Sequence, residues 1–218
     1  PFTELLGILP PGVVARTGVD VAAVPPDPAI ILTQQGRVCP PDRFFALAQW
    51  GDARPFYIQM SAARGRITGE FDRVDEAAVL VQARLFAYFG FGREAVQTLQ
   101  IDGKTSQERQ YLSGVAKIID DDAVPDDLFV QQVSCLSDGA LWALLSSSDS
   151  GLDGQVDPAT VLRAFKALPT WLQVHLGPRL SARFLALGDK ESAMQALATA
   201  VAQPAPLVDA TLVETDLL

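Results

Sequence analysis

The stretch Leu180–Leu197, LSARFLALGDKESAMQAL, describes two helices and the turn between them. Its apolar residues recur at spacings of three and four, which is the period of one face of an α-helix. Gly188 and Asp189 stand between the two apolar runs, where a glycine can end one helix and an aspartate can cap the next. The stretch therefore predicts a helical hairpin.

An earlier stretch, Ala83–Leu99 (ARLFAYFGFGREAVQTL), has the same organisation. Counted from Gly90, it has alanine, glutamine and leucine at the same offsets at which they follow Gly188. Since a glycine again separates two apolar runs of helical period, we expect a second helical hairpin here.

Capping residues, prolines and glycines predict the remaining helices. The expected helices cover residues 42–50, 56–67, 76–89, 92–100, 106–119, 128–133, 140–145, 159–168 and 171–176, and Pro178 starts the hairpin described above. The expected fold class is therefore all-α, built from antiparallel helical hairpins.

The chain divides into three parts by composition. Residues 1–41 carry eight of the fifteen prolines and predict an extended arm with one possible short β-hairpin, because proline removes a backbone donor and restrains the residue before it. Residues 42–203 form the expected helical domain, and residues 204–218 form a tail. Because the chain opens at Pro1 rather than at a methionine, we expect a segment processed or excised from a longer protein.

The two hairpins resemble the tetratricopeptide repeat, in which a small residue and an aromatic residue of the first helix are followed by an alanine in the second. The matching residues are Ala83, Phe86 and Ala95 in one unit, and Ser181, Phe184 and Ala193 in the other. The units lie 98 residues apart, close to three 34-residue periods, although the sequence between them shows no two further clear copies.

This resemblance implies that the hairpins stack as an α-solenoid, or right-handed superhelix, whose concave surface binds a peptide or another protein. An irregular α-helical bundle that follows ordinary helix-packing rules is the alternative.

Aromatic residues give the clearest indication of a binding surface. Four of them, Phe86, Tyr88, Phe89 and Phe91, lie in one hairpin, and residues 100° apart on a helix cannot all point inward. We therefore expect Tyr88 or Phe91 to line a binding groove. Packing against a neighbouring hairpin or the N-terminal arm is the alternative.

Two cysteines, Cys39 and Cys135, are too few for a metal cluster. They are either two free thiols or one disulfide, which would stabilise the fold by about 4–5 kcal/mol through loop closure. A disulfide implies a periplasmic or secreted protein, and free thiols imply a cytoplasmic one.

The formal net charge of −9 argues against nucleic acid as a partner, because a phosphate backbone attracts clustered basic residues and the seventeen of this chain are dispersed. No apolar run approaches the ~20 residues that cross a bilayer, so we expect no membrane span.

Catalytic and ligand-binding patterns are incomplete. The single histidine, His175, has no nucleophile motif with it and is interpreted as structural. Residues 149–157 resemble the first nine positions of a calcium loop. Gly151 and Thr160 stand at its third and twelfth positions, where the loop needs acidic ligands. Residues 103–105 are interpreted as a turn rather than a phosphate-binding loop, and Glu70 and Asp72 as ion-pairing or capping groups rather than an acid–base pair.

The sequence therefore predicts a non-catalytic scaffold that binds a protein or peptide and needs no cofactor. The alternative is an accessory helical domain of a larger enzyme or envelope protein whose active part lies outside this chain.

Overall fold

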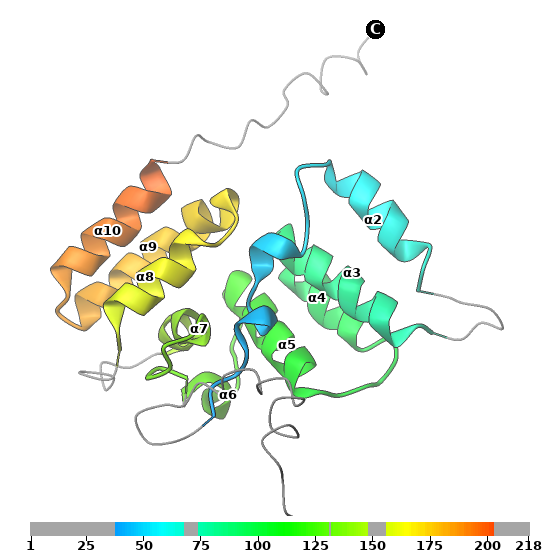
Figure 1. The fold of residues 1–218 in the computed structure, drawn as a ribbon, viewed down its shortest axis with the longest axis horizontal. Coiled ribbons are helices and arrows are strands. Elements are labelled where there is room, and N and C mark those ends of the chain that lie inside the picture. Colours follow the sequence, from blue (N-terminus) through cyan, green and yellow to red (C-terminus); the bar gives the residue numbers. More distant parts are fainter. Residues whose placement is uncertain (1–37, 68–73, 131, 148–155, 203–218) are drawn as a thin grey trace, which may run out of the picture. The chain divides into compact units, whose positions relative to one another are not determined.

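A computed structural model describes residues 38–67, 74–130, 132–147 and 156–202. All regular elements within these ranges are helices (Figure 1), which confirms the all-α prediction. They are the 3-10 helices η2 (Asp42–Phe44) and η3 (Leu47–Gln49), and the α-helices α2 (Phe56–Arg64), α3 (Glu76–Tyr88), α4 (Gly92–Leu99), α5 (Gln107–Ile119), α6 (Asp126–Val130), α7 (Gly139–Ser146), α8 (Pro158–Lys166), α9 (Thr170–Ala186) and α10 (Lys190–Val201).

Both predicted turns join adjacent helices that pack on each other, α3 with α4 and α9 with α10. Gly90 and Gly188 have φ angles of +83° and +78°, which glycine adopts without steric cost. The Asp189 carboxylate accepts a hydrogen bond from the Ser192 N–H at 3.0 Å and so caps α10.

The predicted helix over residues 42–50 is wrong, because this segment forms the two short 3-10 helices instead. Asp42 does not cap its own segment. Its Oδ1 accepts a hydrogen bond from the Asp138 N–H at 2.8 Å, which connects the segment to the start of α7.

The pKa of Asp138 is raised, mainly by burial and to a smaller extent by the charge of Asp42. Oδ1 of Asp138 lies 3.1 Å from Nη1 of Arg163.

The predicted break before Pro178 is also wrong, because α9 runs through this proline from Thr170 to Ala186. A proline inside a helix leaves the carbonyl four residues earlier without its N–H donor. Here that residue is Val174, and both Val174 and Pro178 lie on the exposed side of α9. Water can therefore hydrate the freed carbonyl, and the helix tolerates the proline.

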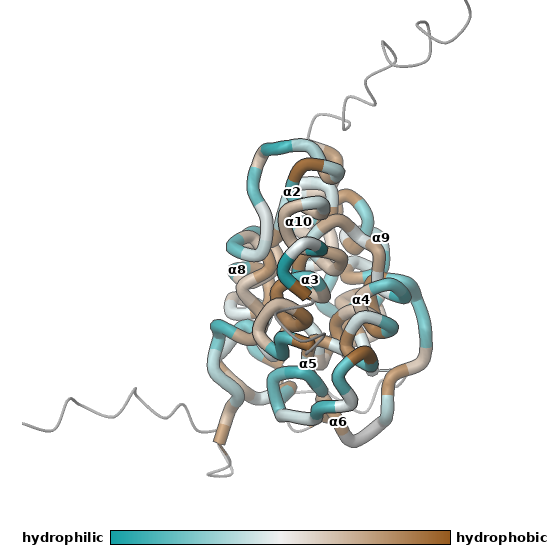
Figure 2. Tube along the Cα trace, turned by 90° about the vertical axis from the view of Figure 1, so that its right-hand side faces the viewer, coloured by the Kyte–Doolittle hydropathy of each residue, from teal (hydrophilic) through white to brown (hydrophobic). Residues whose placement is uncertain are grey.

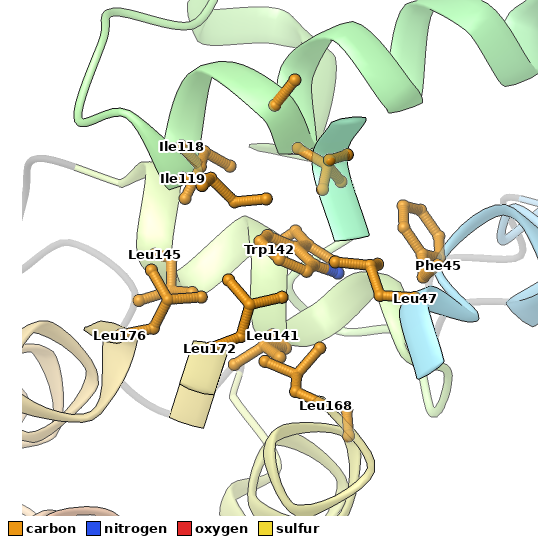
Figure 3. Close-up of a cluster of buried hydrophobic side chains, with 14 of the residues drawn as sticks. Phe45, Leu47, Ile118, Ile119, Leu141, Trp142, Leu145, Leu168, Leu172 and Leu176 are labelled. Atoms are coloured by element: carbon orange, nitrogen blue, oxygen red, sulfur yellow. The ribbon is translucent and has the colours of Figure 1, made fainter. Parts of the chain in front are cut away.

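The hydrophobic core is centred on α7, from which seven consecutive residues, 139–145, are buried. Trp142 is fully buried and lies among Leu47, Ile118, Leu172 and other aliphatic side chains from η3, α5 and α9 (Figure 3). The connecting segments carry much of the polar sequence (Figure 2). No helix in the described part of the chain combines the length and apolarity needed to cross a bilayer.

The C-terminal end of α5 is joined to α4. The carboxylate of Asp120, which follows α5, accepts hydrogen bonds from the Gly92 N–H at 3.3 Å and the Arg93 N–H at 2.7 Å. An acid just outside the end of one helix therefore caps the start of its neighbour, where negative charge is favourable.

The same end of α5 is joined to α9. His175 Nε2 lies 2.8 Å from the Ile119 carbonyl, and Arg179 Nη1 donates to the Ile118 carbonyl at 2.6 Å. These carbonyls belong to the last turn of α5, where acceptors have no partner within the helix. His175 thus has a structural contact, in agreement with its interpretation from the sequence.

Cys39 and Cys135 form a disulfide with a Cα–Cα distance of 5.9 Å. Both residues are buried, and the bond connects the segment before η2 to the segment between α6 and α7. Of the two alternatives that the sequence leaves open, the structure has the bridge.

Replacing both cysteines by alanine is expected to lower the free energy of unfolding by about 4–5 kcal/mol, because the bridge closes a loop of nearly one hundred residues. Urea denaturation of the oxidised chain and of the Cys39→Ala/Cys135→Ala variant measures this difference. The reduced parent chain is the control and should match the variant. A loss below about 1 kcal/mol would contradict the expectation.

Gly92→Ala is expected to destabilise the fold by about 1–3 kcal/mol through overpacking, because an added Cβ would lie 2.1 Å from the Ala116 carbonyl oxygen of α5. Gly65→Ala is the matched control, since the nearest atom to its Cβ would be 3.7 Å away and its φ of −62° suits alanine. Thermal unfolding of both variants tests the close approach of α4 to α5. Equal melting temperatures would refute it.

Candidate binding groove

A groove of about 940 Å³ lies between α2, α3 and the segment that precedes α2. The two helices run side by side in opposite directions (Figure 1). The residues that line the groove are Gln49, Trp50, Gly51, Asp52, Arg54, Gln59, Ala62, Ala63, Gly65, Arg66, Asp75, Ala77, Ala78, Val81 and Leu85.

Small residues create the space in the groove. Ala62 and Ala63 of α2 line it opposite Ala77 and Ala78 of α3, and short side chains leave room between two helices. Val81 also lines it and keeps 49% of its surface exposed. The groove therefore offers an apolar surface that further apolar side chains can cover.

The wall before α2 is held by Gln59. Its buried amide donates to the carbonyls of Asp52 at 3.0 Å and Arg54 at 2.5 Å and accepts from the Asp52 N–H at 3.0 Å. Asp52 also forms a bidentate contact with the Arg54 guanidinium, and this hydrogen bonding lowers the pKa of Asp52. The wall of the groove is thus already ordered in the free chain.

The start of α3 is fixed by Asp75, whose carboxylate accepts hydrogen bonds from the N–H groups of Ala77 at 2.8 Å and Ala78 at 3.1 Å. Asp75 is therefore the N-cap of α3. It positions two of the alanines that line the groove.

Tyr88 supports the groove wall from outside. Its ring packs on Gly51, where an added Cβ would come within 2.4 Å of the ring, and its hydroxyl donates to the Asp52 carbonyl at 3.4 Å. Burial, and to a smaller extent the charge of Asp52, raises the pKa of Tyr88.

Phe91 lies in an aromatic cluster with Phe56 of α2 and Phe86 of α3, at ring-centroid distances of 5.0 and 6.3 Å. It remains 41% exposed. The structure thus places Tyr88 against the wall of the groove and Phe91 in the cluster that joins α2 to α3. Their part in binding remains a prediction.

A second pocket, of about 550 Å³, lies between α4, α5 and α6. Lys104, Arg109 and Lys117 line it, and none of its lining residues is acidic. Two of these cations already have partners, since Lys104 pairs with Glu76 at 3.0 Å and Arg109 with Asp102. The charge available for a ligand is therefore small, and the α2–α3 groove is the better candidate.

Arg109 lies in the first turn of α5 and connects this N-terminal end of the helix to its neighbours. Its guanidinium donates to both carboxylate oxygens of Asp102, at 2.8 and 2.6 Å, to the Glu76 carbonyl at 3.0 Å and to the Leu99 carbonyl at 3.4 Å. One buried side chain of α5 thus holds the start of α3, the end of α4 and the turn after it. Burial opposes ionisation of Asp102, but hydrogen bonds from Lys104 and Arg109 outweigh it and lower its pKa.

The other chemical patterns of the sequence do not form a site in the described residues. Residues 103–105 follow a turn at residues 101–102 and precede α5; Gly103 has a φ of +63°, and Asp102 accepts a hydrogen bond from the Lys104 N–H. Glu70, Asp72 and most of residues 149–157 lie outside the described ranges, as do nearly all of the N-terminal arm and the tail 204–218. The described residues contain no group of three acidic, histidine or cysteine side chains that could hold a metal ion.

Sequence reasoning missed the residues that shape the groove, namely the paired alanines and Gln59. An alanine is a good helix former anywhere, so its presence alone does not signal a groove. Four alanines at neighbouring positions of two consecutive predicted helices, 62, 63, 77 and 78, were the available signal.

No protein-family model, curated protein or solved structure matches the chain.

Asp102→Asn is expected to destabilise the fold at pH 7 by about 3–5 kcal/mol, because it leaves the buried Arg109 guanidinium without a countercharge. The native pKa of Asp102 is lowered, so its stabilising effect is complete above the unfolded value of about 3.9 and is lost as the pH falls through the native value. Urea denaturation between pH 7 and pH 2.5 should show the two chains converging in acid.

Asp122→Asn is the matched control, since it removes the same charge from an exposed ion pair with Arg93 and should change stability at pH 7 by at most about 1 kcal/mol. A difference between the parent chain and Asp102→Asn that persists unchanged at pH 2.5 would contradict the assigned role.

Proposed function

We propose that this chain is a non-catalytic helical scaffold that binds a segment of another protein in the groove between α2 and α3. The proposal includes the tetratricopeptide-like organisation expected from the sequence, with hairpins stacked as an α-solenoid. The observation that carries it is the alanine-lined groove of about 940 Å³ with an exposed valine on its wall.

An amphipathic helix is the ligand that fits this groove best. A groove between two side-by-side helices accepts a third helix, whose larger apolar side chains enter the space that small residues leave. The hydrogen bonds of Gln59 and Asp75 hold both sides in place before binding, which lowers the ordering cost of association.

The polar residues of the groove favour a ligand with charges at its edges. Arg54 and Asp52 are paired with each other, and the Asp75 carboxylate is used as a cap, whereas Arg66 is exposed on the groove wall. We expect an acidic residue of the ligand to approach Arg66, at a contribution of at most about 1 kcal/mol because the site is solvated.

The disulfide supports an oxidising compartment for this function. Such bonds persist in secreted and periplasmic proteins and are rare in the reducing cytoplasm. We therefore propose a periplasmic or secreted scaffold. The alternative of an accessory domain of a larger enzyme or envelope protein remains a prediction.

Selection of peptides from a displayed random library, using the full oxidised chain as bait, tests the proposal. Selected peptides should carry apolar residues at helical spacing. Val81→Lys should weaken their binding at least tenfold in titration calorimetry, because a charged side chain would occupy the apolar wall.

Val174→Lys is the matched control, since Val174 is also an exposed helical valine but lies on α9 and does not line the groove. It should leave the affinity unchanged. Peptides that bind the parent chain and Val81→Lys equally well would overturn the assignment of the groove.

A further inference from the structure

The second pocket, between α4, α5 and α6, has one polar side and apolar walls. The polar side is a face of α5, on which Gln110, Ser113 and Lys117 follow each other at i, i+3 and i+7. The aliphatic residues that line the pocket are Val96, Leu99, Pro125 and Leu128. A ligand in this pocket would therefore meet hydrogen-bonding groups on one side and aliphatic surface on the other.

The walls of the second pocket are already fixed in the free chain. Helix α6 packs directly on α5 at Gly114, where an added Cβ would lie 2.5 Å from Cδ2 of Leu128. The buried Gln132, in the segment after α6, donates a hydrogen bond from its amide to the Tyr111 hydroxyl of α5 at 3.0 Å. Because these contacts exist before binding, little free energy is lost in ordering the pocket around a ligand.

Lys117 supplies a positive charge that a ligand can use. The other cations of the pocket, Lys104 and Arg109, pair with Glu76 and Asp102. The Lys117 ammonium has no ion-pair partner in the part of the chain that the structure describes. Lys117 is half-buried, and partial burial strengthens the attraction between an ammonium and an anion relative to open solvent.

The three acidic residues that follow α5 have partners of their own. Asp120 accepts hydrogen bonds from the first two N–H groups of α4. Asp121 pairs with Arg179 at 3.2 Å, and Asp122 pairs with Arg93 at 3.4 Å. These carboxylates are already matched, so the ammonium in the pocket remains available to a ligand.

We propose that the second pocket binds a small molecule that carries one carboxylate on an aliphatic body. The carboxylate would accept hydrogen bonds from the Lys117 ammonium and the Ser113 hydroxyl, which lie one helical turn apart. The aliphatic body would cover Val96 and Leu128. The volume of about 550 Å³ is typical of small-molecule sites. This pocket is separate from the α2–α3 groove, so the proposal does not depend on the proposed function.

A monoanion is favoured over ligands of other charge. One unpaired ammonium matches a single negative charge, whereas a dianion would bring a second charge without a partner. The chain has a formal net charge of −9, which repels multiply charged anions at long range. A cationic head group would meet the like charge of Lys117.

Titration with three ligands that share one aliphatic chain tests the proposal. The full oxidised chain, labelled with 15N, is titrated with decanoate, decanol and decylammonium below their micelle-forming concentrations, and amide shifts are followed by NMR. Decanoate should bind saturably, with the largest shifts in residues 96–99, 113–117 and 128. It should bind about fivefold more tightly than decanol, because only the carboxylate can pair with Lys117. Decylammonium should bind more weakly than decanol.

Lys117→Met should weaken decanoate binding about fivefold and leave the affinity for decanol unchanged, because it removes the charge and keeps an apolar stem. Lys190→Met is the matched control, since Lys190 begins α10 and does not line the pocket. It should leave both affinities unchanged. Ser113→Leu should weaken the binding of decanoate and decanol alike, because a larger side chain fills the pocket.

Four results would overturn the proposal. They are no saturable binding of decanoate, equal affinities for decanoate and decylammonium, equal effects of Lys117→Met and Lys190→Met, or largest shifts in residues 77–81, which would place decanoate in the α2–α3 groove instead.

Discussion

The arrangement of the helices depends on how the C-terminal end of α5 is satisfied. A helix leaves its last carbonyls without donors, and burial makes such unpaired acceptors costly. In this chain, His175 and Arg179 of α9 approach the carbonyls of Ile119 and Ile118. Asp120, one residue further, accepts from the first N–H groups of α4. One helix end thus fixes the positions of two others.

The other end of α5 is fixed by a different kind of interaction. Arg109 is held by a bidentate pair with Asp102 and by two backbone carbonyls, and both charged side chains are buried. A guanidinium that donates to four acceptors positions backbone segments more strictly than apolar contacts do, because its hydrogen bonds are directional. Since one of the carbonyls belongs to Glu76, the first residue of α3, this contact also places one wall of the candidate groove.

The sequence predicted the features that depend on neighbouring residues. Gly90 and Gly188 mark turns because their φ angles are accessible to glycine, and Asp189 caps α10 through an N–H group three residues away. The failures involve distant partners. Asp42 binds the N–H of Asp138, and the tolerance of Pro178 depends on which side of α9 faces water. The groove was missed for the same reason, because its width reflects how α2 packs on α3.

The disulfide also determines how force passes through the chain. A tension applied between residue 38 and any described residue after Cys135 would run through the covalent bond from Cys39 to Cys135. The intervening part, which contains α2 to α6 and the groove, would carry almost none of this load. A partner held in the groove would therefore stay bound while the chain is stretched, provided that the bond remains oxidised.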